Sequence, residues 1–160
     1  MPTQDYIDGV FRAFEGEVYG ERLFKALAED EPIGKVSTVW SRIGDMERLT
    51  KARLLPLAVG YNGDLEDLIQ RGRERAGEDI PPLCSKPWRA VVEHFIPKTP
   101  AAIGRYTTLK GLAPKAERAV IGQLLGHGQA FAACMHELHA GHIDAAAAVI
   151  NRFLEATPVE

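Results

Sequence analysis

The chain has 160 residues, with 19 lysines and arginines against 22 aspartates and glutamates, which leaves a net charge of −3. This length can bury one core, so we expect residues 1–160 to form a single domain. Nucleic-acid binding is not expected, because phosphate contacts need clustered lysine and arginine and no such excess is present. A membrane span is not expected either, because no apolar run reaches the roughly 18 residues that it needs.

The predicted helices follow one another along the whole chain, since no segment alternates apolar and polar residues as a strand does. Pro32 and Gly34 separate the first two helices, and Asp64 is placed to cap the third. Prolines divide residues 77–114, which we predict to be an irregular connection with two short helices. Pro158 is expected to stop the last helix. The expected helices span residues 4–29, 35–59, 65–76, 86–95, 101–112, 115–140 and 143–155.

The cellular location is predicted from the first residues and from the cysteines. The start of the chain, MPTQDYIDGV, lacks the basic and then apolar pattern of a signal peptide. Cys84 and Cys134 lie far apart in the sequence and form no Cys-x-x-Cys pattern. We therefore expect two reduced thiols in a cytoplasmic protein.

The first helix carries a second apolar stripe beside the one that we expect to face the core. Its members are Phe11, Val18 and Leu27. An apolar stripe on the outside of a long helix favours self-association, so we predict a homodimer through this surface.

Two glutamates stand at inward positions of the first two predicted helices. Glu17 lies in the run FEGEVY of the first helix, within its apolar stripe. Glu47 lies in WSRIGDMERLT of the second helix, and Thr50 ends that run three residues later. Residues three apart share one helix face, so Glu47 and Thr50 are expected to point the same way.

A weak internal repeat relates the first helix to the helix predicted over 115–140. A shift of 112 residues brings Gly16 onto Gly128 and Glu17 onto Gln129. The identity is low, so a chance similarity stays an alternative. His127 lies two residues before Gln129, and it would replace a carboxylate only if this alignment slips by two positions, which turns a helix by about 200°.

On these motifs and on the order of its helices, the chain resembles the ferritin-like (rubrerythrin-related) superfamily over most of its length. The resemblance implies an all-α, ferritin-like four-helix bundle with short extra helices between the two helix pairs. Members of this superfamily hold two iron or manganese ions inside the bundle. The first and third helices each supply a glutamate, and the second and fourth each supply Glu-x-x-His.

The resemblance implies that most of this ligand set is lost. Glu17 matches the first glutamate and Glu47 the second, whereas Thr50 stands at the first histidine and Gln129 at the third glutamate. The last predicted helix carries no Glu-x-x-His. Threonine and glutamine are neutral, weak ligands, and two buried dications need several carboxylates, so we expect the diiron centre to be absent.

Three hypotheses for the function follow. The leading one is a metal-free bundle protein that binds a small apolar ligand or a protein partner. The alternative is a divergent metal-dependent oxidoreductase or peroxidase, with iron or manganese held by Glu17, Glu47 and His127. The third is a stress-related scaffold, for which the sequence carries no feature of its own. For the buried carboxylates themselves, the alternative to a functional pocket is a structural polar network that fixes the register of the helices. The residues expected to form the polar cluster or pocket are Glu17, Glu21, Trp40, Glu47, Thr50, His127 and Gln129.

Two glycines mark the expected pocket on the helix over 115–140. Gly126 and Gly128 together cost that helix about 2 kcal/mol relative to alanine. Such a cost indicates that the glycines either admit a bulky neighbour, for which Phe14 and Trp40 are the candidates, or leave space for a ligand.

Overall fold

The computed structural model describes residues 1–156, and over that range every regular element is a helix, which confirms the all-α prediction. None of the described helices is both long enough and apolar enough to cross a membrane. The stop predicted at Pro158 lies outside the described residues. The elements are α1 (Gln4–Asp30), α2 (Gly34–Gly60), α3 (Leu65–Cys84), α4 (Trp88–Phe95), η1 (Ile96–Lys98), α5 (Thr99–Leu112), η2 (Lys115–Glu117), α6 (Arg118–His139) and α7 (Ile143–Ala156).

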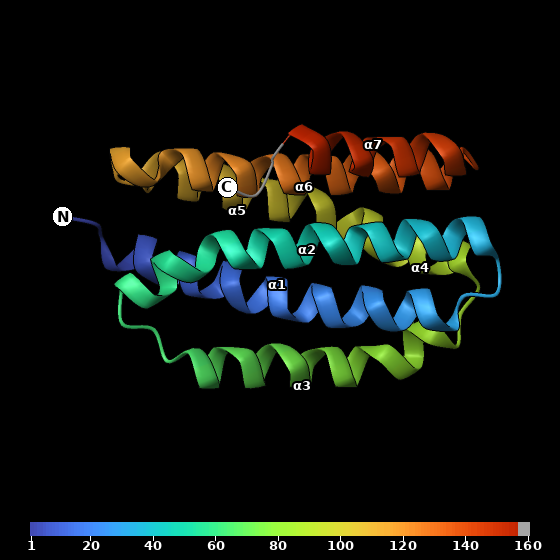
Figure 1. The fold of residues 1–160 in the computed structure, drawn as a ribbon, viewed down its shortest axis with the longest axis horizontal. Coiled ribbons are helices and arrows are strands. Elements are labelled where there is room, and N and C mark those ends of the chain that lie inside the picture. Colours follow the sequence, from blue (N-terminus) through green and yellow to red (C-terminus); the bar gives the residue numbers. More distant parts are fainter. Residues whose placement is uncertain (157–160) are drawn as a thin grey trace.

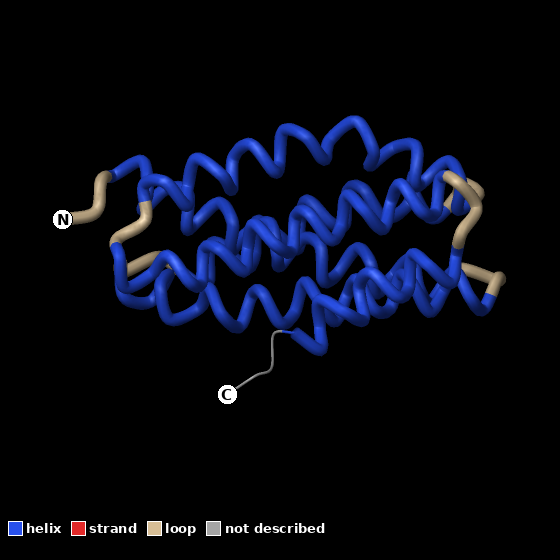
Figure 2. The backbone as a smooth tube through the Cα atoms, turned by 90° about the horizontal axis from the view of Figure 1, so that it is seen from above, coloured by secondary structure: helices blue, strands red, loops and turns tan. Residues whose placement is uncertain are grey.

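The helices lie side by side along one long axis, as the two views of Figures 1 and 2 show. Helices α1 and α2 form one antiparallel pair, and α6 and α7 form a second pair that packs against α2. Helix α3 covers the side of α1 that faces away from this second pair, while α5 packs beside α6 (Figure 1). Helices α1, α2 and α6 therefore meet in the interior.

Local signals explain where several helices begin and end. The hydroxyl of Thr3 accepts a hydrogen bond from the backbone N–H of Tyr6 at 3.2 Å and caps α1. Asp64 accepts a bond from the backbone N–H of Asp67 at 3.1 Å, so the predicted cap of α3 is confirmed. Between α6 and α7, Gly141 adopts a φ of 83°, which glycine tolerates without strain.

Helix α3 is longer than the sequence predicts. Residues 77–84 were expected to be irregular because of Pro81 and Pro82, yet α3 continues to Cys84, so that prediction is wrong. Both prolines stand in the last turn, and each lacks the N–H that would bond to the carbonyl four residues earlier. Leu83 is buried in the apolar core at 2% exposure, and this packing outweighs the local cost of the prolines.

The apolar stripe predicted for a dimer is covered by the chain itself. Val18 and Leu27 are only 5% and 4% exposed, and Phe11 is half-buried. Helix α3 approaches α1 closely here, since a Cβ at Gly72 would lie 2.8 Å from the backbone oxygen of Glu15. The prediction that this stripe is a free surface is wrong, and the homodimer stays a prediction without it.

The apolar core forms two clusters along the helices. One contains Trp40 and Met135, and the other contains Tyr6 and Ile121. On α1, α2 and α6 the change from one cluster to the other falls near the middle of the helix. The buried polar side chains in that middle layer are Glu17, Glu47, Thr50 and His127.

Candidate metal centre

Three ionisable side chains meet in the middle layer, one from each of α1, α2 and α6. The imidazole Nδ1 of His127 lies 3.4 Å from a carboxylate oxygen of Glu17, and Nε2 lies 3.3 Å from one of Glu47. One ligand atom of each residue lies within 4.8 Å of the other two. Glu17, Glu47 and His127 are 1%, 7% and 4% exposed, so water does not screen their charges.

Thr50 orients the imidazole. Its hydroxyl oxygen lies 2.9 Å from Nδ1 of His127, and its position one turn after Glu47 places it on the same side of α2. In the tautomer that carries its proton on Nδ1, the imidazole donates to the threonine oxygen and Nε2 faces Glu47. A histidine that binds a metal is typically held in this way, through a hydrogen bond from its other nitrogen.

The two carboxyl groups are in different electrostatic states. Burial raises the pKa of Glu17 well above its usual value, and the neighbouring Glu47 raises it further. Burial acts in the same direction on Glu47, but the charge of His127 and hydrogen bonds to Glu17 and His127 outweigh it, so the pKa of Glu47 is lowered. Without a cation, the pair therefore holds one proton, on Glu17.

One carboxyl oxygen of Glu17 has no partner. Its Oε2 atom is fully buried and makes no hydrogen bond to any of the described residues. An unpaired buried polar atom costs about 1–3 kcal/mol, so its retention needs a reason. A bound cation would supply one.

The distance from Nε2 of His127 to Glu47 fits a shared ion better than a hydrogen bond. Separations of 3.3 and 3.4 Å exceed the roughly 2.7–3.2 Å of good N–H···O bonds. Two ligand atoms about 2.1 Å from one ion lie about 3.4 Å apart when the angle between them is near tetrahedral. Only the 3.3 Å between Nε2 and Glu47 is such a separation, because the 3.4 Å to Glu17 is measured from Nδ1, which bonds to Thr50. One ligand atom of each residue still lies within 4.8 Å of the other two, so an ion on Nε2 and Glu47 needs the carboxylate of Glu17 to turn toward it.

A glycine on α1 makes room for the carboxylate of Glu47. A Cβ at Gly20 would lie 2.6 Å from the carboxyl carbon of Glu47. Any larger residue would push that carboxylate away from Glu17 and His127. Gly20 is thus part of the site, although it contributes no ligand atom.

Tyr106 brings a third kind of polar group close to the cluster. A Cβ at Gly128 would lie 3.0 Å from the ring of Tyr106, which shows how tightly α5 packs on α6 at this point. Burial raises the pKa of Tyr106 above its usual value, and the charges of Glu17 and Glu47 raise it further. The phenol therefore stays protonated beside the two carboxyl groups.

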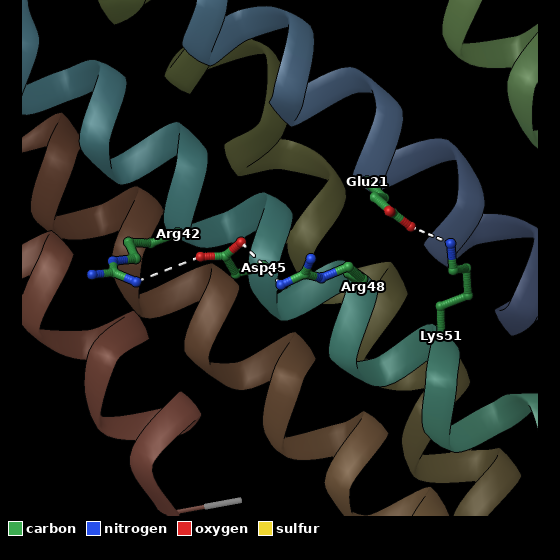
Figure 3. Close-up of polar contacts among 5 residues, drawn as sticks. All are labelled: Glu21, Arg42, Asp45, Arg48 and Lys51. Atoms are coloured by element: carbon green, nitrogen blue, oxygen red, sulfur yellow. Dashed lines mark hydrogen bonds and ion pairs between the residues drawn. The ribbon is translucent and has the colours of Figure 1, made fainter. Parts of the chain in front are cut away.

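Glu21 lies outside the cluster, contrary to the prediction. Figure 3 shows its carboxylate turned to the ammonium of Lys51, with which it forms an ion pair. The same view shows Arg48 directed at Asp45, with which it forms an ion pair at 3.7 Å. Because Lys51 neutralises it at the edge of the helix pair, Glu21 is unsuited to bind a metal.

The sequence also predicted Trp40 and Gln129 in the polar cluster, and the structure places neither of them there. Trp40 is fully buried in an apolar cluster, 5.8 Å from the ring of Phe24, and Gln129 is exposed. Two positions on a helix differ by about 200°, so an inward His127 requires an outward Gln129. The weak repeat therefore aligns α6 with α1 two residues out of register.

The neighbours of the two glycines on α6 could not be identified from the sequence. Gly126 and Gly128 did indicate bulky neighbours, but these are Phe153 and Tyr106 and not Phe14 or Trp40. Tyr106 comes from α5, within the segment that was predicted to be a mere connection. No periodicity relates α5 to α6, so only the fold could bring them together.

No family model matches the chain, and no curated protein or solved structure matches it either. The function must therefore follow from the chemistry of the site.

Proposed function

We propose that the protein binds one divalent transition-metal ion, iron or manganese, inside a ferritin-like four-helix bundle made of α1, α2, α6 and α7. The observation that carries the proposal is the buried, unpartnered Oε2 atom of Glu17 in a cluster whose ligand atoms converge. Imidazole suits iron and carboxylates suit manganese, so a set of two carboxylates and one imidazole favours these two metals.

The charge of the cluster favours one ion and not the pair that the resemblance implied. Two carboxylates balance one dication, and Glu17, Glu47 and His127 are the one such group among residues 1–156. Two dications would leave two positive charges unbalanced in a buried site.

A rearranged ligand set connects this site to the ferritin-like pattern. Thr50 stands where the pattern has a histidine, and its short side chain leaves space that His127 of α6 fills. The hydrogen bond between Thr50 and His127 supports this exchange. The histidine would thus be retained in the site but supplied by a different helix.

Three protein ligands leave coordination positions open for a substrate, as in catalytic metal sites. We therefore place the protein among metal-dependent oxidoreductases or peroxidases, in which the metal supplies the redox chemistry. In such a site, Glu17 and Glu47 hold the ion, Thr50 orients His127, and the burial of all four residues excludes bulk water.

A metal-free role is the second candidate, and the raised pKa of Glu17 favours it. A proton held on Glu17, with Glu47 hydrogen-bonded to Glu17 and His127, satisfies most of the cluster without a cation. The cluster would then fix the register of the helices beside a pocket for a small apolar ligand.

Metal binding by matched variants tests the proposal. The protein is purified without chelator, and its metal content and its affinities for Mn²⁺ and Fe²⁺ are measured. We expect one ion per chain, and a loss of at least about 100-fold in affinity for Glu47→Gln and His127→Gln. Glu21→Gln is the control, because Glu21 lies one turn from Glu17 and is neutralised by Lys51.

The outcomes separate the two candidates. A folded protein that binds no stoichiometric metal contradicts the proposal and leaves the metal-free role. An equal loss of metal in Glu21→Gln would place the ion elsewhere and contradict it as well.

Location and assembly complete the proposal. Cys84 and Cys134 are free, as expected for a reducing compartment, so we place the protein in the cytoplasm. Self-association as a homodimer is proposed from the sequence, and light scattering of the purified chain tests it.

A further inference from the structure

A cavity of about 200 Å³ extends from the three candidate ligands toward the surface. Gly16 borders it on α1, and a Cβ built there would meet no atom within 4 Å. Pockets for drug-sized ligands are larger, about 300–1,000 Å³, so this cavity fits only a small molecule. Glu17, Glu47 and His127 are among its lining residues.

One wall of the cavity is aromatic. Phe24 of α1, Phe95 of α4 and Phe131 of α6 all line it. Their ring centroids lie 5.4 to 5.7 Å apart, which makes one continuous cluster of three rings. Tyr106 adds a further ring from α5. Such walls favour an apolar, flat ligand body.

The lining residues also include cations, and two of them have no acidic partner. Lys98 and Arg105 are exposed and form no ion pair within 4.0 Å among the described residues. Arg75 differs, because it pairs with Glu15 at 3.5 Å and lies over the ring of Tyr19. Lys98 and Arg105 are therefore available to an anion that enters the cavity.

The floor of the cavity, formed by Glu17, Glu47 and His127, decides by its charge when an anion can bind. Among residues 1–156, the acidic residues that line the cavity are Glu17 and Glu47 alone. Without a cation, a charged carboxylate at the floor repels an anion, whereas one bound dication balances both carboxylates. Anion binding in the cavity should therefore depend on the metal.

We propose that this cavity binds a small organic acid, with its carboxylate on Lys98 and Arg105 and its apolar body along the three phenylalanines. The far end of that body then points to the ion held by Glu17, Glu47 and His127. This inference rests on the proposed metal site, and it names the class of substrate that the site would take.

Benzoate and its uncharged analogue benzamide are the probes. The full chain is loaded with Mn²⁺, and each probe is titrated by calorimetry. Relaxation of the probe's ring protons by the paramagnetic ion reports whether the ring lies near the metal. We expect benzoate to bind at least about tenfold more tightly than benzamide, since only benzoate carries the charge that strengthens hydrogen bonds to Lys98 and Arg105.

Three variants locate the binding site. The double variant Lys98→Gln with Arg105→Gln should weaken benzoate at least about tenfold while leaving the affinity for Mn²⁺ within about threefold. Lys110→Gln, on α5 but away from the cavity, is the charge control and should change neither value. Gly16→Leu fills the cavity from α1. It should abolish the Mn²⁺-induced relaxation of the benzoate ring protons while leaving Lys98 and Arg105 in place.

The failures of the two proposals are distinguishable. If Mn²⁺ binds but benzoate is no tighter than benzamide, or is unaffected by the double variant or by Gly16→Leu, this inference is wrong and the metal site stands. If Mn²⁺ does not bind, the proposed function is wrong, and this inference is wrong as well because it rests on the metal site.

Discussion

Two polar sites share the same pair of helices, and they differ in almost every physical respect. Glu17 and Glu47 are buried, carry more negative than positive charge, and leave one oxygen without a partner. Glu21 and Lys51, four residues further along each helix, form a closed ion pair whose side chains are 29% and 31% exposed. An inward glutamate alone therefore does not indicate a site, whereas a buried and unbalanced charge does.

The largest expected effect comes from making the buried site apolar. Glu17→Met should abolish metal binding, yet raise the free energy of unfolding of the metal-free protein by about 1–2 kcal/mol, because an unpartnered buried oxygen is removed. Urea unfolding in the presence of chelator measures the second effect. Glu21→Met is the control, and it should lower stability by at most about 1 kcal/mol and leave metal binding intact.

A clear loss of stability in Glu17→Met would weaken the contrast between the two sites. It would mean that the hydrogen bond between Glu17 and Glu47 outweighs the cost of the unpartnered oxygen, as in the metal-free network. The buried site would then be stable without a cation, as the ion pair of Glu21 and Lys51 is.

The outline of the fold follows from local patterns, which is why the sequence predicted most of it. The bounds of α1 and α2 agree with the expected helices within one residue at each end. Their apolar stripes and the turn at Pro32 are local features. The end of α3 was not predictable in this way, because the burial of Leu83 outweighs the prolines before it.

The site was predicted only where one helix carries the information. Glu17, Glu47 and Thr50 were identified because their own helices place them inward. The choice between His127 and Gln129 depends on how α6 is rotated relative to α1, and the weak repeat set that rotation wrongly. Contacts between α5 and α6, which place Tyr106, arise from tertiary packing and leave no periodic trace in the sequence.

A smaller effect is expected when the imidazole loses its orienting partner. Thr50→Val keeps the shape of the side chain but removes the hydroxyl 2.9 Å from Nδ1 of His127. We expect the affinity for Mn²⁺ to fall about 10- to 100-fold, as is typical for such indirect contacts to a metal. Thr38→Val is the control on α2, because that hydroxyl bonds only to the backbone oxygen of Gly34 at the exposed end of the helix. Equal affinities in all three proteins would show that Thr50 does not orient the imidazole.

The smallest effect should come from the ion pair itself. A double-mutant cycle with Glu21→Gln and Lys51→Met isolates its coupling energy, which we expect to be about 0.2–1 kcal/mol, because both side chains remain partly exposed. Most of that coupling should disappear in 1 M salt, where charges are screened within about 3 Å. A coupling above about 2 kcal/mol that resists salt would mean that the pair behaves as a buried one. Burial would then no longer separate the two sites, and only the charge imbalance and the unpartnered oxygen of Glu17 would mark one of them as a metal centre.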